Sequence, residues 1–163
     1  MATKPRLAYF PATFLLLVVF TSVTAQAPGP ESSSLHDNFL QCLTKYTKNS
    51  SSKLSNIVFA NNNPKFPTIL QNYIRNARFN TSSTPKPSLI VTPQKESHVQ
   101  ATVICAKSFN IQLKIRSGGH DYEGISYISD QPFIILDMFN FRRITVDIKN
   151  EVAVVQAGAT LGE

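Results

Sequence analysis

The feature that most constrains the fold is a strand–helix–strand succession in the middle of the chain. The stretches "SLIVT" (88–92) and "IQLKI" (111–115) are short β-branched runs, and apolar residues recur at helical spacing between them. Thr92 and Pro93 are residue types favoured at a helix N-cap and at the first helical position. Two strands joined by a helix within about thirty residues form a βαβ unit with parallel strands and a right-handed crossover. The chain is therefore expected to contain a parallel sheet.

Helical patterns precede this unit and strand patterns follow it. Leu35–Tyr46 and Thr68–Ala77 carry apolar side chains at helical spacing. Phe133–Met138 is a continuous apolar run, Ile144–Ile148 alternates, and Glu151–Ala159 follows a short turn. Alternation with short turns predicts antiparallel pairing in this C-terminal part. We expect an α+β fold, with a small parallel βαβ part followed by antiparallel strands.

A glycine turn directly follows the βαβ unit, in the stretch "RSGGHDYEG" that begins at Arg116. Gly118 and Gly119 allow positive φ and close backbone approach, and consecutive amides in such a turn form a nest for an anion. Arg116 and Ser117 could add a charge and a hydroxyl donor, so the turn fits a pyrophosphate. The spacing matches neither a P-loop nor the G-x-G-x-x-G fingerprint. Because a Gly-Gly pair alone marks ordinary turns more often, both interpretations remain open at this point.

The N-terminus predicts secretion. Lys4 and Arg6 precede an apolar run from Phe10 to Phe20, and small residues follow, which is typical of a signal peptide over residues 1–27. The apolar run has about half of the ~20 residues that a spanning helix needs, so no membrane attachment is expected after cleavage. The net charge of +6 is scattered along the chain, which argues against a nucleic-acid partner.

Cysteines and sequons agree with an oxidising compartment. The even count of two, Cys42 and Cys105, predicts one disulfide, and two free buried thiols are the alternative. Asn49 and Asn80 begin N-x-S/T sequons in polar stretches and predict N-linked glycans.

The residues themselves assign no catalytic group and no metal ligand. His36, His98 and His120 lie in separate contexts and lack the spacing of zinc ligands. Neither a Ser-His-Asp or Cys-His arrangement nor a pair of carboxylates is recognisable.

Taken in order, "LIVTP", "LKIRSGGHDYEGISYIS", "FIILDM" and "ITVDIKNEVAVVQAGATLGE" resemble the N-terminal part of plant berberine bridge enzyme-like flavoproteins. This family includes reticuline oxidase-like and cannabinoid synthase-like proteins, and has the vanillyl-alcohol oxidase / p-cresol methylhydroxylase (VAO/PCMH) type of FAD-binding fold. The resemblance runs from Leu35 to Glu163. It implies that residues 85–163 are the N-terminal part of that FAD-binding domain, preceded by a helical segment with loops over residues 28–84.

The resemblance also implies FAD as the cofactor and a role for each residue of the glycine turn. The turn would wrap the pyrophosphate, Ser126 would lie beside the cofactor, and His120 would bond covalently to a ring methyl of the isoalloxazine. The family's N-terminal cysteine pair would correspond to Cys42 and Cys105. The implied cofactor-binding residues are Arg116, Ser117, Gly118, Gly119, His120, Asp121, Tyr122 and Ser126.

The implied function is that of an FAD-dependent oxidoreductase, which takes hydride from a small-molecule or carbohydrate substrate and passes electrons to oxygen or another acceptor. The expected location is extracellular, in the cell wall or in the vacuole. The chain ends at Glu163, before the second, cysteinyl flavin link of many members and before the family's catalytic base. An incomplete FAD-binding domain in a truncated form is therefore expected, and the alternative is a non-catalytic secreted glycoprotein without a complete flavin site.

Overall fold

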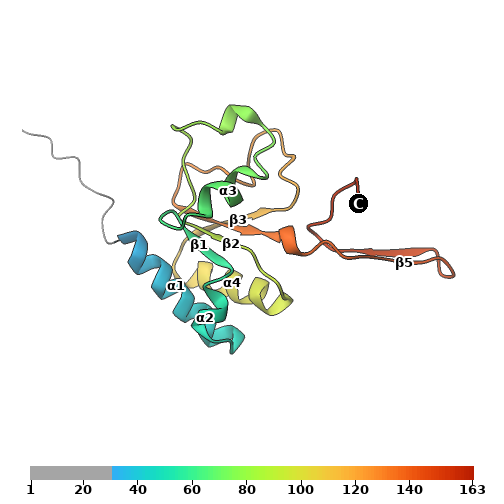
Figure 1. Cartoon of the computed structure of the whole chain (residues 1–163), viewed down its shortest axis with the longest axis horizontal. Helices are drawn as coiled ribbons and strands as arrows, with labels where there is room; N and C mark the ends of the chain where they lie inside the picture. The colour runs from blue at the N-terminus through green and yellow to red at the C-terminus, as the bar shows by residue number, and fades with distance from the viewer. Residues whose placement is uncertain (1–30) are drawn as a thin grey trace, which may run out of the picture.

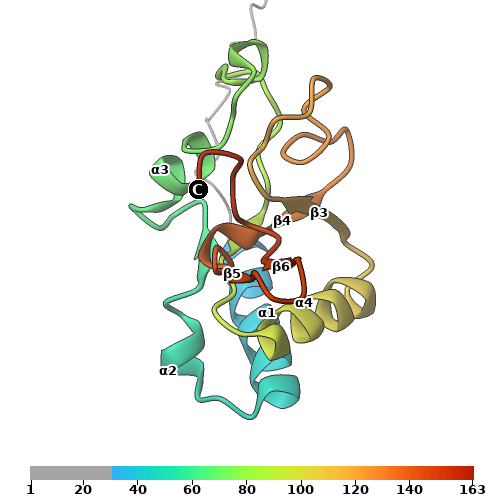
Figure 2. The same ribbon diagram turned by 90° about the vertical axis from the view of Figure 1, so that its right-hand side faces the viewer.

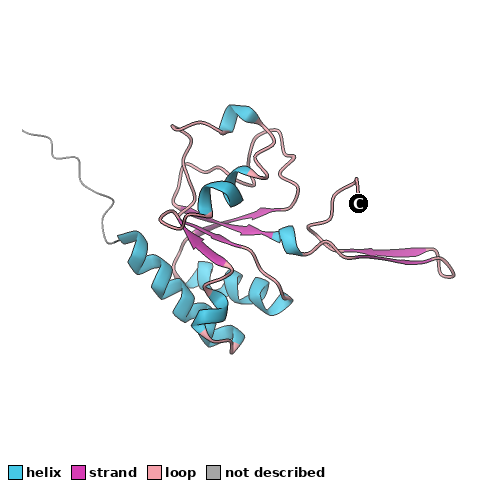
Figure 3. Cartoon of the chain, in the orientation of Figure 1, coloured by secondary structure: helices cyan, strands magenta, loops and turns pink. Residues whose placement is uncertain are grey.

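The computed structural model describes residues 31–163 (Figure 1, Figure 3). The predicted signal peptide, residues 1–27, lies outside the described residues. In chain order the helices, 3-10 turns (η) and strands are α1 Glu31–Thr47, α2 Ser51–Leu54, β1 Val58–Ala60, α3 Phe66–Gln71, η1 Ala77–Phe79, β2 Leu89–Val91, α4 Glu96–Ser108, β3 Gln112–Arg116, β4 Phe133–Asp137, η2 Met138–Asn140, β5 Ile144–Asp147 and β6 Val152–Val155.

Four strands form the central sheet in the order β1-β2-β4-β3. β4 pairs in parallel with both β2 and β3, and β1 pairs antiparallel with β2. All five residues of β4 are buried, as expected of a parallel strand that is covered on both faces. The prediction of antiparallel pairing after the glycine turn is therefore wrong for residues 133–137. A continuous apolar run has no solvent face, and alternation begins only at β5.

The predicted βαβ unit is present, with one difference in strand order. β2 and β3 run parallel and are connected through α4, but β4 lies between them. α4 begins at Glu96 with Lys95 at the N-cap, three residues later than the Thr92 cap predicted from the sequence. The helix predicted at Thr68–Ala77 is divided, because α3 ends at Gln71 and only a 3-10 turn follows at η1.

Each face of the central sheet has its own apolar core. α1 and α4 cover one face, and α3 with the loop around Tyr127 covers the other (Figure 2). Both cores combine residues from before and after position 85, so the N-terminal segment and the C-terminal part are packed together. Fully buried members include Phe39, Leu43, Leu89, Val91, Cys105, Ile134 and Leu136 on the first face, and Ile90, Tyr127, Phe133 and Ile135 on the second.

The predicted disulfide is confirmed. Cys42 on α1 and Cys105 on α4 are bonded, with their Cα atoms 5.9 Å apart, and no free cysteine occurs in residues 31–163. The bond therefore ties the first helix to the crossover helix of the βαβ unit.

β5 and β6 form a separate antiparallel hairpin that projects from the body of the molecule (Figure 1). Its register pairs Ile144 with Val155 and Val146 with Ala153. Every residue of both strands is exposed, as the burial patterns of β5 and β6 show. Antiparallel pairing was predicted for this part of the chain, and it is confirmed here. No helix within the described part of the chain is long and apolar enough to cross a bilayer.

Candidate functional site

The glycine turn leaves the sheet at the carboxyl end of β3, beside the carboxyl end of β4. Gly119 has φ +66° and is buried, and a Cβ placed on it would lie 2.0 Å from the backbone oxygen of Tyr73. Only glycine is compatible with both the conformation and the close approach. The ring of His120 lies over Gly118, since a Cβ there would be 2.9 Å from Cδ2 of the imidazole.

The backbone donors of this turn are free. Among the residues that the structure describes, the N–H groups of Gly118, Gly119 and His120 donate no hydrogen bond. Successive unpaired N–H groups in a turn with a left-handed glycine can bind an anion, which is one of the two alternatives that the sequence left open. This arrangement favours the ligand site over the ordinary turn.

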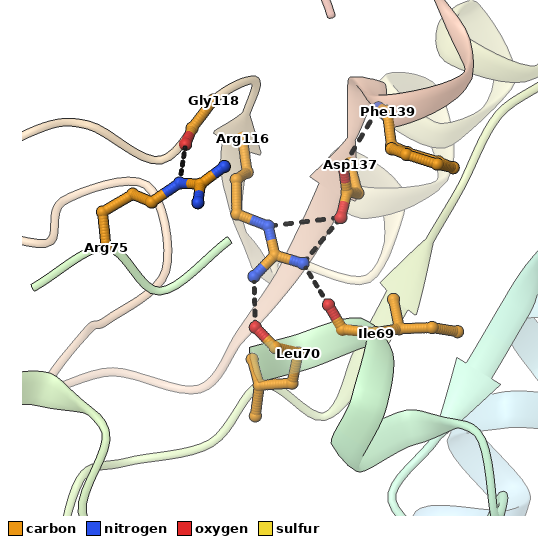
Figure 4. A network of polar contacts seen from close by, with 7 residues as sticks. All are labelled: Ile69, Leu70, Arg75, Arg116, Gly118, Asp137 and Phe139. Carbon is orange, nitrogen blue, oxygen red and sulfur yellow. Dashed lines mark hydrogen bonds and ion pairs between the residues drawn. The ribbon is translucent and has the colours of Figure 1, made fainter. Parts of the chain in front are cut away.

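Arg116 has a different set of contacts from the one expected. Its side chain is fully buried, and its Nε and Nη2 donate to Oδ2 of Asp137 at 3.2 and 2.6 Å. Nη1 and Nη2 also donate to the backbone oxygens of Leu70 and Ile69 at 2.7 and 2.8 Å (Figure 4). The guanidinium is therefore turned into the protein, under the turn. In this structure it holds together the ends of β3, β4 and α3.

Sequence reasoning missed the partner of this cation. Asp137 is the last residue of β4 and lies directly opposite Arg116 in the parallel register. Its Oδ1 accepts a hydrogen bond from the backbone N–H of Phe139 at 3.0 Å, so both carboxylate oxygens are paired. A charged residue that ends a wholly apolar strand was the available signal, because such a residue needs a buried counter-charge.

The residues after the glycines differ in exposure. His120 is exposed and Tyr122 is 89% exposed, whereas Asp121 is partly buried. Ser126 Oγ donates to Oδ2 of Asp121 at 2.5 Å, so these two predicted cofactor residues are in contact. The other oxygen of Asp121, Oδ1, is buried and has no hydrogen-bond partner among residues 31–163. A buried carboxylate oxygen without a donor indicates a missing partner, such as a ligand hydroxyl.

A cavity of about 240 Å³ lies at the same edge of the sheet. Its walls include Asn72, Tyr73, Thr92, Asp137 and Phe139, so it lies beyond the carboxyl ends of β2 and β4. Ligands of open α/β sheets are bound at this edge.

The C-terminal stretch "QAGATLGE" folds back onto η2. A Cβ on Gly158 would lie 1.9 Å from the backbone oxygen of Met138, so this position also needs glycine. Arg142 Nε donates to Oε1 of Glu163 at 2.6 Å, and the backbone N–H of Thr160 donates to Oε2 at 2.9 Å. These hydrogen bonds lower the pKa of the Glu163 carboxyl, with the larger contribution from Arg142.

The two sequons differ in exposure. Asn80 is exposed directly after η1. Asn49 is half-buried between α1 and α2, and its side-chain amide lies 3.1 Å from Nε2 of His98. No group of three or more His, Cys, Asp or Glu residues in the described part of the chain could hold a metal ion.

The residues of the turn fit the cofactor that the sequence implied. Three free amides suit the pyrophosphate of FAD, and the unpaired Asp121 oxygen suits a hydroxyl of the same ligand, since a carboxylate repels phosphate. Consistently, residues 87–163 match the family described as "FAD binding domain". The match indicates FAD as the cofactor, and it confirms the predicted fold class.

Over nearly its whole length the chain is a relative of the berberine bridge enzyme-like proteins of Arabidopsis thaliana. It is 53% identical to berberine bridge enzyme-like 21 over 150 residues, which are 92% of this chain and 28% of the relative. It is 50% identical to berberine bridge enzyme-like 19 over 163 residues, 100% of this chain and 28% of that relative. Among solved structures, wild-type Phl p 4.0202, a glucose dehydrogenase, is similar with a TM-score of 0.69 at 38% identity, over 77% of this chain and 25% of that chain. The chain thus spans 28% of the length of the first two relatives.

Proposed function

We propose that this chain is the flavin-anchoring part of an FAD-dependent oxidoreductase in which the flavin is attached covalently to His120. The observation that carries the proposal is the position of His120, an exposed imidazole directly after a glycine turn with three free amides. The match of residues 87–163 to an FAD-binding domain supports the cofactor. Phosphate bound to the nest would place the remainder of the ligand near this side chain.

The residues from Gly118 to Tyr122 divide the binding of the cofactor in this proposal. The amides of Gly118, Gly119 and His120 hold the pyrophosphate, and Asp121, oriented by Ser126, accepts a hydrogen bond from a cofactor hydroxyl. Tyr122 supplies an exposed ring for packing against the cofactor. Bound FAD supplies the hydride-accepting chemistry. The protein contributes binding and orientation.

His120 would hold the flavin through a ring nitrogen, whose lone pair is available for a bond to a ring methyl carbon. The link prevents dissociation, which suits a secreted protein that works far from the cofactor's source.

The substrate is proposed as a small molecule or a carbohydrate, with oxygen or another molecule as the electron acceptor. The similarity to a glucose dehydrogenase favours the carbohydrate. Secretion follows from the predicted signal peptide over residues 1–27, and glycans are proposed at Asn80 and Asn49.

The test is covalent flavin on the purified protein. The 163-residue chain is secreted from a yeast host, denatured in acid, and examined for flavin absorbance in the protein pellet. We expect a flavin mass on the tryptic peptide Ser117–Arg142, and its loss in a His120→Ala variant. A colourless pellet from the parent protein would overturn the proposal and would favour the non-catalytic glycoprotein instead.

A further inference from the structure

The glycine turn rests on a segment that lies outside the matched FAD-binding domain. Residues 69–79, from α3 to η1, precede the matched region of residues 87–163. They nevertheless contact the turn and the following loop at Arg116, Gly118, Gly119, Tyr122 and Gly124. We call residues 69–79 the support segment.

The first contact anchors the base of the turn. Arg116 donates to the backbone oxygens of Ile69 and Leu70 near the end of α3, where helical carbonyls lack partners within the helix. The same guanidinium is 5.8 Å from the ring centroid of Tyr73. The last residue of β3 is thus fixed to the support segment immediately before the glycines.

The second contact sets the direction of a peptide group in the nest. Arg75 Nε donates to the backbone oxygen of Gly118 at 3.2 Å (Figure 4), and its guanidinium lies 5.1 Å from the Tyr73 ring centroid. In a trans peptide the C=O and the next N–H point in opposite directions, and no cis peptide occurs among the described residues. Because the Gly118 carbonyl points to Arg75, the Gly119 N–H points away from Arg75, and the carbonyl is kept out of the nest.

The third contact holds a second backbone carbonyl, two residues after His120 in the chain. Asn76 Nδ2 donates to the backbone oxygen of Tyr122 at 3.0 Å. Its Oδ1 accepts from the backbone N–H of Arg78 at 3.1 Å, so the amide is fixed at both ends. His120 therefore lies between two carbonyls that the support segment holds.

We propose that Arg75 and Asn76 are positioning residues for covalent flavin attachment, which hold the turn in the conformation that presents its amides and His120 to the cofactor. This inference rests on the proposed function. In this proposal the support segment positions the cofactor site, and its residues act through the turn without contacting the flavin.

Two variants remove these contacts with little expected loss of fold. Arg75→Ala removes an exposed side chain. Asn76→Asp keeps the oxygen that accepts from Arg78 but replaces the donor to Tyr122 with a carboxylate oxygen. Arg75→Lys is the conservative variant that should restore a donor. Arg78→Ala is the matched control, since its guanidinium makes no hydrogen bond or ion pair within residues 31–163.

Two readouts are measured on the secreted 163-residue protein. The first is the rate of covalent attachment when flavin-free protein is incubated with FAD, followed in acid-denatured samples. We expect roughly five- to tenfold slower attachment in Arg75→Ala and Asn76→Asp, the loss that fits one hydrogen bond. Arg75→Lys should recover most of the rate, and Arg78→Ala should match the parent. The second readout, the backbone amide chemical shifts of residues 117–122, should change in the two slow variants only.

The outcomes separate this inference from the proposed function. If the parent attaches flavin and both variants attach it at the parent rate, the positioning role is wrong and the function stands. If the parent never attaches flavin, the proposed function is wrong, and this inference is wrong as well because it rests on that function. Slower attachment together with a lower thermal midpoint and no recovery in Arg75→Lys would indicate general destabilisation, and would also overturn the positioning role.

Discussion

Two strands of similar composition have opposite environments in this molecule. β4 reads FIILD and every residue is buried, whereas β6 reads VAVV and every residue is exposed. β4 is central in a four-stranded sheet with helices on both faces, and β6 has only β5 beside it. An isolated two-stranded hairpin is at best marginally stable in water. The difference shows that an apolar run predicts a strand but does not predict whether other elements bury that strand.

The candidate site belongs to the first of these two regions. Its nest, its buried ion pair and its support segment all belong to the central sheet and the elements packed on it. The stretch "QAGATLGE", directly after β6, returns to the central body, where Gly158 contacts the backbone of η2 at Met138. The stability of the sheet and that of the hairpin should therefore respond separately to substitution.

The largest expected effect is at the carboxyl end of β4. Asp137→Ala leaves the fully buried Arg116 without its counter-charge, and removing one partner of a buried ion pair costs about 3–5 kcal/mol. Denaturant unfolding measures this loss. Asp130→Ala, which removes an exposed carboxylate from the loop before β4, should stay within about 0.5 kcal/mol of the parent. Equal effects of the two substitutions would show that the Arg116–Asp137 pair is not buried in solution.

The next effect concerns the face covered by α1 and α4. Replacing both Cys42 and Cys105 by Ala removes a cross-link between residues 63 apart in sequence, which should cost about 4 kcal/mol on the chain-entropy account. Thermal unfolding with and without reductant is the measurement. Reductant should lower the midpoint of the parent and leave that of the double variant unchanged. A parent midpoint insensitive to reductant, at full loss of the bond, would contradict the expectation.

Local patterns predicted much of this fold, and non-local partners explain what they missed. Helical spacing gave α1 and α4, and alternation with a short turn gave the hairpin. The insertion of β4 between β2 and β3 joins strands that are distant in sequence, and no local pattern records strand order.

The residues of the candidate site could be named from the sequence, but the residues that support them could not. The glycines, His120 and Asp121 stand together in one stretch of sequence, so they could be recognised there. The supports act on backbone oxygens, those of Ile69, Leu70 and Gly118 among them. Every residue has such an oxygen, so these contacts leave no mark in the sequence. The buried role of Arg116 was missed for a related reason, since its partner lies 21 positions away.

A smaller effect is expected from pH at the amino end of α4. Burial, and secondarily Lys95, lower the pKa of His98 below its ordinary value of 6.5. As pH falls through 6.5, the unfolded chain therefore binds a proton that the folded protein does not, and this residue's contribution to stability decreases. The thermal midpoint should fall between about pH 7 and pH 5, and His98→Gln should flatten that fall. Lys95→Gln should flatten it less, and an unchanged slope in His98→Gln would contradict the assignment.

The last prediction compares the burial of the two sheets by making the same substitution, valine to threonine, in each of them. Val91 in β2 is 0% exposed and Val154 in β6 is 67% exposed, and threonine has nearly the same shape as valine. Val91→Thr buries a hydroxyl and should cost about 1–3 kcal/mol, while Val154→Thr should stay within about 0.5 kcal/mol. Denaturant unfolding of both variants and of the parent gives the two differences. If Val154→Thr costs as much as Val91→Thr, the exposed face of the hairpin is covered in solution, and β5–β6 is then an interface and not a free edge of the molecule.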